Sequence, residues 1–208
     1  MNIIKPYIEI EDQVDGKLIL EKLERIGRVC YKSECKIDEG SAKNFLQNII
    51  KRKHESVLEH VNLSIRIVCD RGVSHEIVRH RIASYSQEST RYCNYANDKF
   101  NSELTFIKPC FWTEDSEEYK LWKSTMLDIE KSYMNLVHRG VKPQEARSLL
   151  PNSIKTELVM TMNIRSWRNF LNLRTDVSAH PQIREVAFMI LNELKSQIPI
   201  LFDDIKTI

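Results

Sequence analysis

The chain has 208 residues, of which 42% are hydrophobic and 29% are charged. This composition suits one folded domain with a hydrophobic core and excludes a disordered chain. The formal net charge of +2 is too small for general attraction to nucleic acids or anionic membranes, so an anion site must come from locally clustered arginines. No apolar run reaches the roughly 20 residues that span a bilayer, and no signal peptide is visible, so a cytoplasmic location is expected.

In the first half of the chain, the spacing of apolar residues changes from a helical period to the alternation of a strand. Apolar spacing predicts helices over residues 17–28 and 41–52, the second with Ser41 as its N-cap. Alternation over residues 61–67 predicts a half-buried strand, and a short helix is expected over residues 73–79.

Residues 84–97 are polar without an apolar period, and we expect an ordered loop there. Further elements are expected as strands over residues 103–108 and 156–163 and as helices over residues 117–139, 144–150, 166–173 and from Pro181 onward. Helices and strands do not alternate strictly. The pattern therefore favours an α+β fold, with an antiparallel or mixed central sheet flanked by helices, in a single domain over residues 1–208.

The five cysteines are an odd number and form no CxxC pair. They favour neither a disulfide framework nor a zinc site, and a reducing compartment is their natural setting.

The most informative segment is RHRIASYSQESTRY, residues 79–92, which holds three arginines, one histidine and three serines. Arginine presents a planar fork of donors that matches phosphate, and serine hydroxyls can complete an anion site. The amide of Gln87 can both donate to and accept from a base edge. A short basic cluster in a nearly neutral chain favours a mononucleotide over a polymer, although a solvated basic turn is the alternative for so short a motif.

The pattern of RHR, seven residues and a serine, here Ser89, resembles the signature of flavin-dependent thymidylate synthases. Three other segments resemble the family in the expected order: HESVLEH at residues 54–60, EARSLLP at residues 145–151 and NIRSWRNFLNLR at residues 163–174. The histidines of HESVLEH are six residues apart, so they do not share a helical face as zinc ligands would.

The resemblance implies an enzyme, a methyltransferase that converts dUMP to dTMP. Methylenetetrahydrofolate would donate the carbon, NADPH would be the reductant and FAD would be the cofactor, with no metal. It also implies a homotetramer with shared active sites, no nucleic-acid polymer and no membrane as partners.

Residue by residue, the resemblance gives Arg174 the catalytic role. A guanidinium beside N3 and O2 of the pyrimidine would stabilise the negative charge that develops as the carbon is attached. The dUMP site would comprise Glu76, Arg79, Gln87, Ser89, Thr90, Arg91, Arg147 and Arg174. The FAD site would comprise Ser56, Glu59, Arg79, His80, Arg81, Gln87, Asn163, Arg165 and Asn169. His54 would cover the flavin face where folate or nicotinamide docks.

The chain departs from the family pattern at several positions. Glu76 stands where the family often has Gln, and Ser86 and Gln87 replace an Asn–Glu pair seen in many members. The flavin-contacting histidine of the family falls at Ser178, and the role of His180 stays open between flavin contact and the start of a helix.

Two other classes of function remain open from the sequence. One is a nucleic-acid-binding module that stacks bases on Tyr85, Tyr92 and Tyr95. The other is a flavoprotein that binds nucleotide without methyl transfer.

Overall fold

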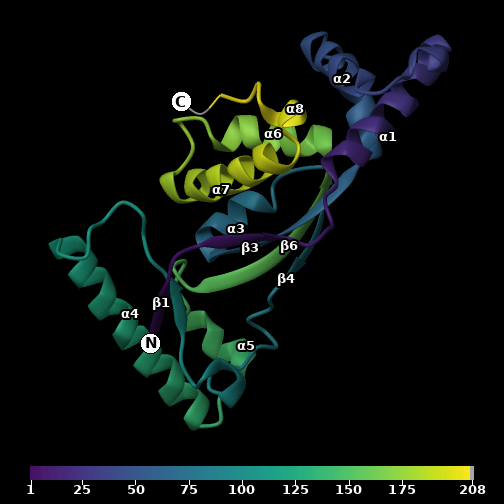
Figure 1. Cartoon of the computed structure of the whole chain (residues 1–208). Helices are drawn as coiled ribbons and strands as arrows, with labels where there is room; N and C mark the ends of the chain where they lie inside the picture. The colour runs from purple at the N-terminus through teal and green to yellow at the C-terminus, as the bar shows by residue number, and fades with distance from the viewer. Residues whose placement is uncertain (207–208) are drawn as a thin grey trace. The chain divides into compact units, whose positions relative to one another are not determined.

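Two sheets organise the chain, whose computed structural model describes residues 1–206 (Figure 1). The strands are β1 (Asn2–Ile4), β2 (Tyr7–Ile10), β3 (Asn62–Asp70), β4 (Ser84–Gln87), β5 (Thr105–Ile107) and β6 (Lys155–Asn163). The larger sheet has four strands in the order β2-β3-β6-β4, and β1 pairs in parallel with β5 in the smaller. Strands and helices in this arrangement confirm the α+β class expected from the sequence.

Eight α-helices are present among the described residues. They are α1 (Gly16–Arg28), α2 (Ser41–Lys51), α3 (Arg71–Ile77), α4 (Glu117–His138), α5 (Pro143–Ala146), α6 (Ile164–Arg174), α7 (Pro181–Gln197) and α8 (Pro199–Phe202). Short 3-10 helices are η1 (Val29–Tyr31), η2 (Glu34–Lys36), η3 (Glu55–His60), η4 (Asp98–Phe100) and η5 (Arg147–Leu149).

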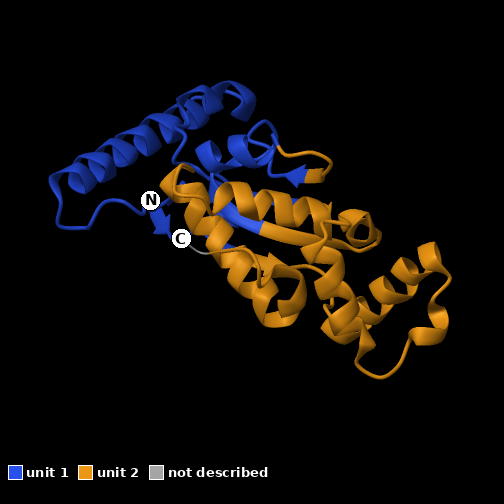
Figure 2. Cartoon of the chain, turned by 90° about the horizontal axis from the view of Figure 1, so that it is seen from above, with its two compact units in different colours: residues 1–7, 67–79, 86–159 blue, residues 8–66, 80–85, 160–208 orange. Residues whose placement is uncertain are grey.

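Residue contacts divide the chain into two units (Figure 2). Unit 1 comprises residues 1–7, 67–79 and 86–159, and unit 2 comprises residues 8–66, 80–85 and 160 onward. The single domain expected over residues 1–208 stays a prediction.

Unit 1 has a core of aromatic and aliphatic side chains beneath α4. Leu104, Phe106 and Tyr133 are fully buried there, together with the mostly buried Trp122. The indole nitrogen of Trp122 donates to the hydroxyl of Ser153 at 3.1 Å, so its polar atom is satisfied. Helix α4 ends as the sequence predicts, because Gly140 follows it with φ of +85°.

Unit 2 packs α6, α7 and α8 beside one another, and α1 against α2 (Figure 1). The indole of Trp167 is fully buried and donates to the carbonyl oxygen of Leu63 at 3.0 Å. The backbone N–H of Ile164 donates to the carbonyl oxygen of Val61 at 3.0 Å. These two bonds attach the first turn of α6 to the start of β3.

Two local predictions are wrong. Gly40, with φ of +86°, is the N-cap of α2, whereas Ser41 is its first residue and donates its hydroxyl to the carboxylate of Glu24 at 2.8 Å. A capping hydroxyl accepts from an N–H of the first helical turn, whereas the Ser41 oxygen accepts from the N–H of Asp38 at 3.1 Å and its hydrogen goes to Glu24, which is 1% exposed. Residues 84–87 form β4 instead of loop, since pairing within a sheet satisfies their backbone without an apolar period.

The remaining predicted elements are confirmed, although with altered ends. β3 extends three residues beyond the expected strand, and its last four residues, 67–70, are all buried. The alternation of its first five residues, 62–66, does not continue there, whereas β6, the other interior strand, alternates over its whole length. The predicted helix over residues 144–150 is divided into α5 and η5. β1, β2 and α8 were not predicted, because such short segments carry too few residues for a period.

Candidate active site

A polar cavity of about 510 Å³ lies in unit 2, between η3, the residues after α3 and one side of α6. It contains several residues of the FAD set expected from the sequence: Glu59, Arg81, Asn163, Arg165 and Asn169. Its other lining residues, which the sequence did not single out, are Glu55, Ile82, Ser166, Arg168 and Asn172. The helical spacing of the α6 members could have identified Arg168 and Asn172.

Local structure explains why α6 presents a polar side. The side chain of Asn163 caps the helix by accepting from the N–H of Ser166 at 2.8 Å. Arg165, Asn169 and Asn172 then follow at helical spacings of four and three, which places them on one side. The opposite side carries Trp167 and other buried residues.

The charged side chains around this cavity form ion pairs, but one of their donors has no hydrogen-bond partner within the described residues. Arg165 donates to the carboxylate of Glu59 at 2.6 Å, and both side chains are about half exposed. Arg168 is only 4% exposed and donates twice to Asp204 at 2.7 Å. Within the described part of the chain, the buried Nε of Arg168 has no hydrogen-bond partner.

Unit 2 also joins two predicted site residues directly. The Nε of Arg174, at the end of α6, donates to Nε2 of His80 at 2.9 Å. His80 is 8% exposed, and its ring packs edge-on against Phe170 with ring centroids 4.8 Å apart. Burial, and to a smaller degree the charge of Arg174, lowers the pKa of His80 to about 4. The ring is therefore neutral near pH 7.

A second polar cavity, of about 520 Å³, lies in unit 1. Its lining includes two residues of the expected dUMP set, Thr90 and Arg147. Arg71 and His75 also line it, and sequence reasoning missed both. Their position in α3, on the segment directly before the arginine-rich motif, is the signal that could have identified them. Two guanidinium groups with a hydroxyl and an imidazole suit a phosphate group.

The polar motif in unit 1 is held by its own hydrogen bonds. The amide nitrogen of Gln87 donates to the hydroxyls of Ser74 at 2.9 Å and Thr156 at 3.2 Å. The hydroxyl of Ser89 accepts from the backbone N–H of Arg91 at 3.3 Å. Gln87 and Ser89 are thus fixed, while the side chain of Arg91 is exposed.

The tyrosines do not form a row of stacking platforms. Tyr95 is 5% exposed and donates its hydroxyl to the carboxylate of Glu88 at 2.7 Å. The hydroxyl of half-buried Tyr85 donates to the carbonyl oxygen of His80 at 2.8 Å. Tyr92 is 76% exposed. The hypothesis of base stacking on all three rings is therefore wrong.

Other expected site residues are among the described residues that line neither polar cavity. In unit 2, Ser56 is exposed on η3, and His54 is exposed just before it. In unit 1, Glu76 is half-buried in α3 and Arg79 is exposed two residues beyond that helix. His180 is the N-cap of α7, accepting at Nδ1 from the N–H of Gln182 at 3.3 Å, so the helix-start alternative describes its position.

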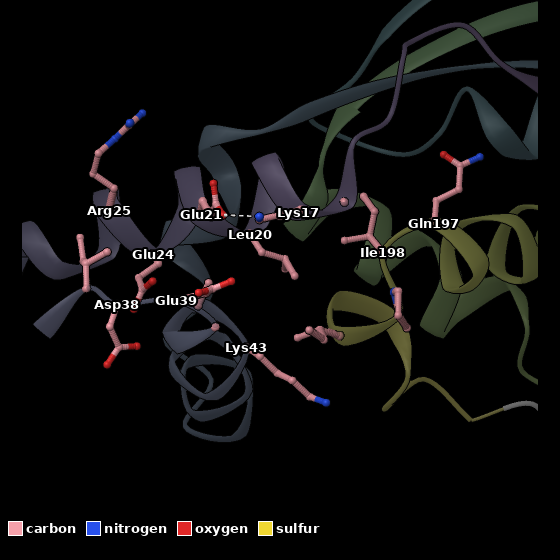
Figure 3. Close-up of a pocket in the computed structure, with 16 residues that line it drawn as sticks. Lys17, Leu20, Glu21, Glu24, Arg25, Asp38, Glu39, Lys43, Gln197 and Ile198 are labelled. Carbon is pink, nitrogen blue, oxygen red and sulfur yellow. Dashed lines mark ion pairs between the residues drawn. The ribbon is translucent and has the colours of Figure 1, made fainter.

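A larger cavity of about 920 Å³ lies in unit 2 beside α1 (Figure 3). Its walls come from α1, residues 37–43 and the turn between α7 and α8. Lys17 and Glu21 form an ion pair of 3.9 Å on its rim, and Glu24 is occupied by Arg28 and Ser41. None of the expected site residues lines this cavity, so its size does not make it the candidate site.

Residues 1–206 contain no group of three His, Cys, Asp or Glu side chains placed to hold a metal ion. Nor does any helix in this described range have the length and apolar character to cross a membrane.

Comparison with known proteins identifies the family. Residues 19–200 match the family model described as thymidylate synthase complementing protein. The chain is 38% identical over 174 residues to the flavin-dependent thymidylate synthase of Pyrococcus furiosus, covering 83% of this chain and 68% of that one. It is 34% identical over 184 residues to the enzyme of Geobacter sulfurreducens, covering 85% and 78%. The chain belongs to the family of flavin-dependent thymidylate synthases, and its match spans about two thirds of the length of the archaeal relatives.

Solved structures agree with this fold. Thymidylate synthase X from Helicobacter pylori, solved with FAD and dUMP, has a TM-score of 0.76 and 26% identity, with 96% of this chain and 98% of that chain covered. The UMP/dUMP methylase PolB from Streptomyces cacaoi, bound with 5-Br dUMP, has a TM-score of 0.79 at 21% identity, covering 98% and 96%. The second likeness supports the fold alone.

Proposed function

We propose that the chain is a thymidylate synthase that methylates dUMP to dTMP, with methylenetetrahydrofolate as carbon donor, NADPH as reductant and FAD as cofactor. The observation that carries the proposal is the polar cavity of unit 2, where side chains from η3, residues 81–82 and α6 meet. The family and the Helicobacter pylori relative with FAD and dUMP support it. The cytoplasmic location expected from the sequence remains part of the proposal.

The residues of this cavity fit a flavin dinucleotide. Arg81 and Arg165 offer donors for phosphate oxygens, and the amides of Asn163 and Asn169 can both donate and accept. When bound there, FAD would supply the carrier chemistry for the one-carbon unit and the hydride.

The chain itself would bind, orient and polarise the nucleotide. Arg147 and Thr90 in unit 1, with Arg71 beside them, would hold the phosphate. Arg174 would lie beside N3 and O2 of the pyrimidine, where its charge offsets the negative charge that develops as the carbon is attached. The remaining residues of the two expected sets keep the roles that the resemblance implies. His54 would cover the face where folate or nicotinamide docks.

A homotetramer with shared sites is part of this proposal. A cavity of about 510 Å³ is modest for one dinucleotide and leaves little enclosing surface for two further substrates. A second subunit would supply that surface. The partners are therefore small molecules and copies of the chain, without nucleic-acid polymer or membrane.

The absorption spectrum of the purified protein is the first test. An absorption band at about 450 nm is typical of flavins, and such a band that changes when dUMP is added supports the proposal. A colourless protein that ignores added FAD contradicts it.

Tritium release from C5 of labelled dUMP then separates the proposed activity from a flavoprotein without methyl transfer. Arg174→Ala is expected to keep its flavin and lose most of this release. Ser89→Ala is expected to stay partly active, since the serine would orient the nucleotide and not attack it.

A further inference from the structure

The side chain of His80 is held so firmly that its ring nitrogen can act as a fixed acceptor. The carbonyl oxygen of His80 accepts from the hydroxyl of Tyr85 at 2.8 Å and from Nη1 of Arg81 at 2.9 Å. Its ring lies edge-on against Phe170, which is fully buried. Both backbone and ring are thus fixed, and Nε2 meets Nε of Arg174 at 2.9 Å.

The partner determines the protonation of this ring. A guanidinium carries only donors and does not lose its proton, so Nε2 of His80 must offer a lone pair. The hydrogen of the neutral ring then sits on Nδ1. Burial and the charge of Arg174 both lower the pKa of His80, which keeps this neutral form at working pH.

A bond at Nε constrains Arg174 more than a bond at a terminal nitrogen would. Nε lies nearest the aliphatic stem, so a partner there fixes the plane of the guanidinium. The directions of the two terminal amino groups follow from that plane. A planar pair of donors set in advance matches a planar acceptor edge such as that of a pyrimidine.

We propose that His80 is a positioning residue, which accepts a hydrogen bond from Nε of Arg174 and so orients the guanidinium toward the pyrimidine of the substrate. This inference rests on the proposed function. His80 acts through Arg174 in this role, separately from any contact with the flavin.

The bond can be tested without turnover. Nitrogen-15 spectra of the full-length protein, with histidine and arginine labelled, report which ring nitrogen carries the hydrogen. We expect a protonated Nδ1 and an unprotonated Nε2 for His80, assigned by loss of the signals in His80→Gln. In Arg174→Lys, which has no Nε donor, the His80 signals should shift. A proton on Nε2 at pH 7 overturns the proposal.

Two substitutions separate the acceptor from the ring. Phe in place of His80 keeps a ring beside Phe170 but removes the acceptor, whereas Gln retains an oxygen that can reach Arg174. We expect kcat, measured by tritium release per bound flavin, to fall at least about tenfold in His80→Phe and to return to within about threefold of wild type in His80→Gln, with KM changed less than kcat. Equal loss in both variants, or none in His80→Phe, contradicts the proposal.

The double variant identifies the route of the effect. Arg174→Lys removes Nε and the planar guanidinium that His80 would orient, so adding His80→Phe to it should lower kcat by less than about twofold further. A second full tenfold loss would mean that His80 acts independently of Arg174. Absence of tritium release from the wild type would instead reject the proposed function. The nitrogen-15 spectra would still test the hydrogen bond between Arg174 and His80.

Discussion

Arg168 donates two hydrogen bonds of 2.7 Å to the carboxylate of Asp204, 36 residues further along the chain. The same guanidinium donates to the carbonyl oxygen of Leu201. It also donates to the carboxylate of Glu55, at 3.4 Å. A single buried side chain therefore ties α6 to η3, to α8 and to the residues that follow α8. It does so at the edge of the polar cavity of unit 2.

Removing the charge of Asp204 should destabilise the protein. We expect Asp204→Asn to lower the free energy of unfolding by about 1–2 kcal/mol, because the buried Arg168 loses its main charged partner. The hydrogen bonds from Arg168 lower the pKa of Asp204. The contribution is therefore present above the ordinary value of 3.8 and is lost as the pH falls through the lowered value.

Urea unfolding at pH 7 measures this difference, with Asp203→Asn as the control. Asp203 is the exposed neighbour of Asp204, and its substitution should change stability by less than about 0.5 kcal/mol. Equal losses in the two variants would show that general charge, and not the bond to Arg168, is responsible.

Arg147 should contribute to nucleotide affinity through the cavity of unit 1. We expect Arg147→Ala to weaken dUMP binding about 10- to 100-fold, the value of a charge-assisted contact to phosphate. Calorimetry with dUMP measures the effect, and deoxyuridine without phosphate should bind both proteins alike. Arg139→Ala, on the exposed end of α4, is the control, and a similar loss there would argue against a local contact.

Asn169 should contribute to flavin affinity through the cavity of unit 2. Asn169→Asp adds a negative charge where FAD phosphates are expected, so we predict at least about a tenfold loss of FAD affinity. Asn44→Asp makes the same charge change at an exposed position of α2 and should leave the affinity for FAD unaltered. Fluorescence titration of the flavin-free protein measures both, and unchanged affinity in Asn169→Asp would remove Asn169 from the site.

The neutral form of His80 should make stability depend on pH. Burial first and Arg174 second lower its pKa from 6.5 to about 4, so the unfolded chain takes up this proton before the folded chain does. The contribution is complete above pH 6.5 and is lost as the pH falls toward 4, by at most about 3 kcal/mol. Urea unfolding at several pH values in this range gives the free energy of unfolding, which should change less steeply with pH in His80→Phe than in wild type. Identical slopes would contradict the lowered pKa.

Gly16 should be required by the close approach of another backbone. A Cβ at this position would lie 2.4 Å from the carbonyl oxygen of Gln197, which cannot turn aside as a side chain can. We expect Gly16→Ala to cost about 2 kcal/mol or more in stability. In Gly27→Ala the new Cβ would meet the ring of Phe45 at 2.7 Å, and this ring can move, so the cost should be smaller. Thermal unfolding of both variants checks the order, and the reverse order would contradict it.

Much of the fold follows from short-range pattern. Apolar periods predict α1, α4, α6 and α7, because each is long enough to show a full helical face. Ser41 shows where such reasoning fails. Its type and position favour a cap, yet its oxygen accepts from the N–H of Asp38, before the helix, and its hydrogen is donated to the carboxylate of Glu24, 17 residues away. No local rule includes that partner.

The sequence by itself determined the family, through the motif of residues 79–92, and the types of the longer elements. These depend on residues a few positions apart, whose relation is set by covalent geometry. Only the tertiary structure decided that Arg165 meets Glu59 across 106 residues, that His80 holds Arg174, and that Arg71 and His75 line a cavity with Arg147. Such pairings depend on how distant segments bury their apolar faces together, and no single segment of the sequence predicts this packing.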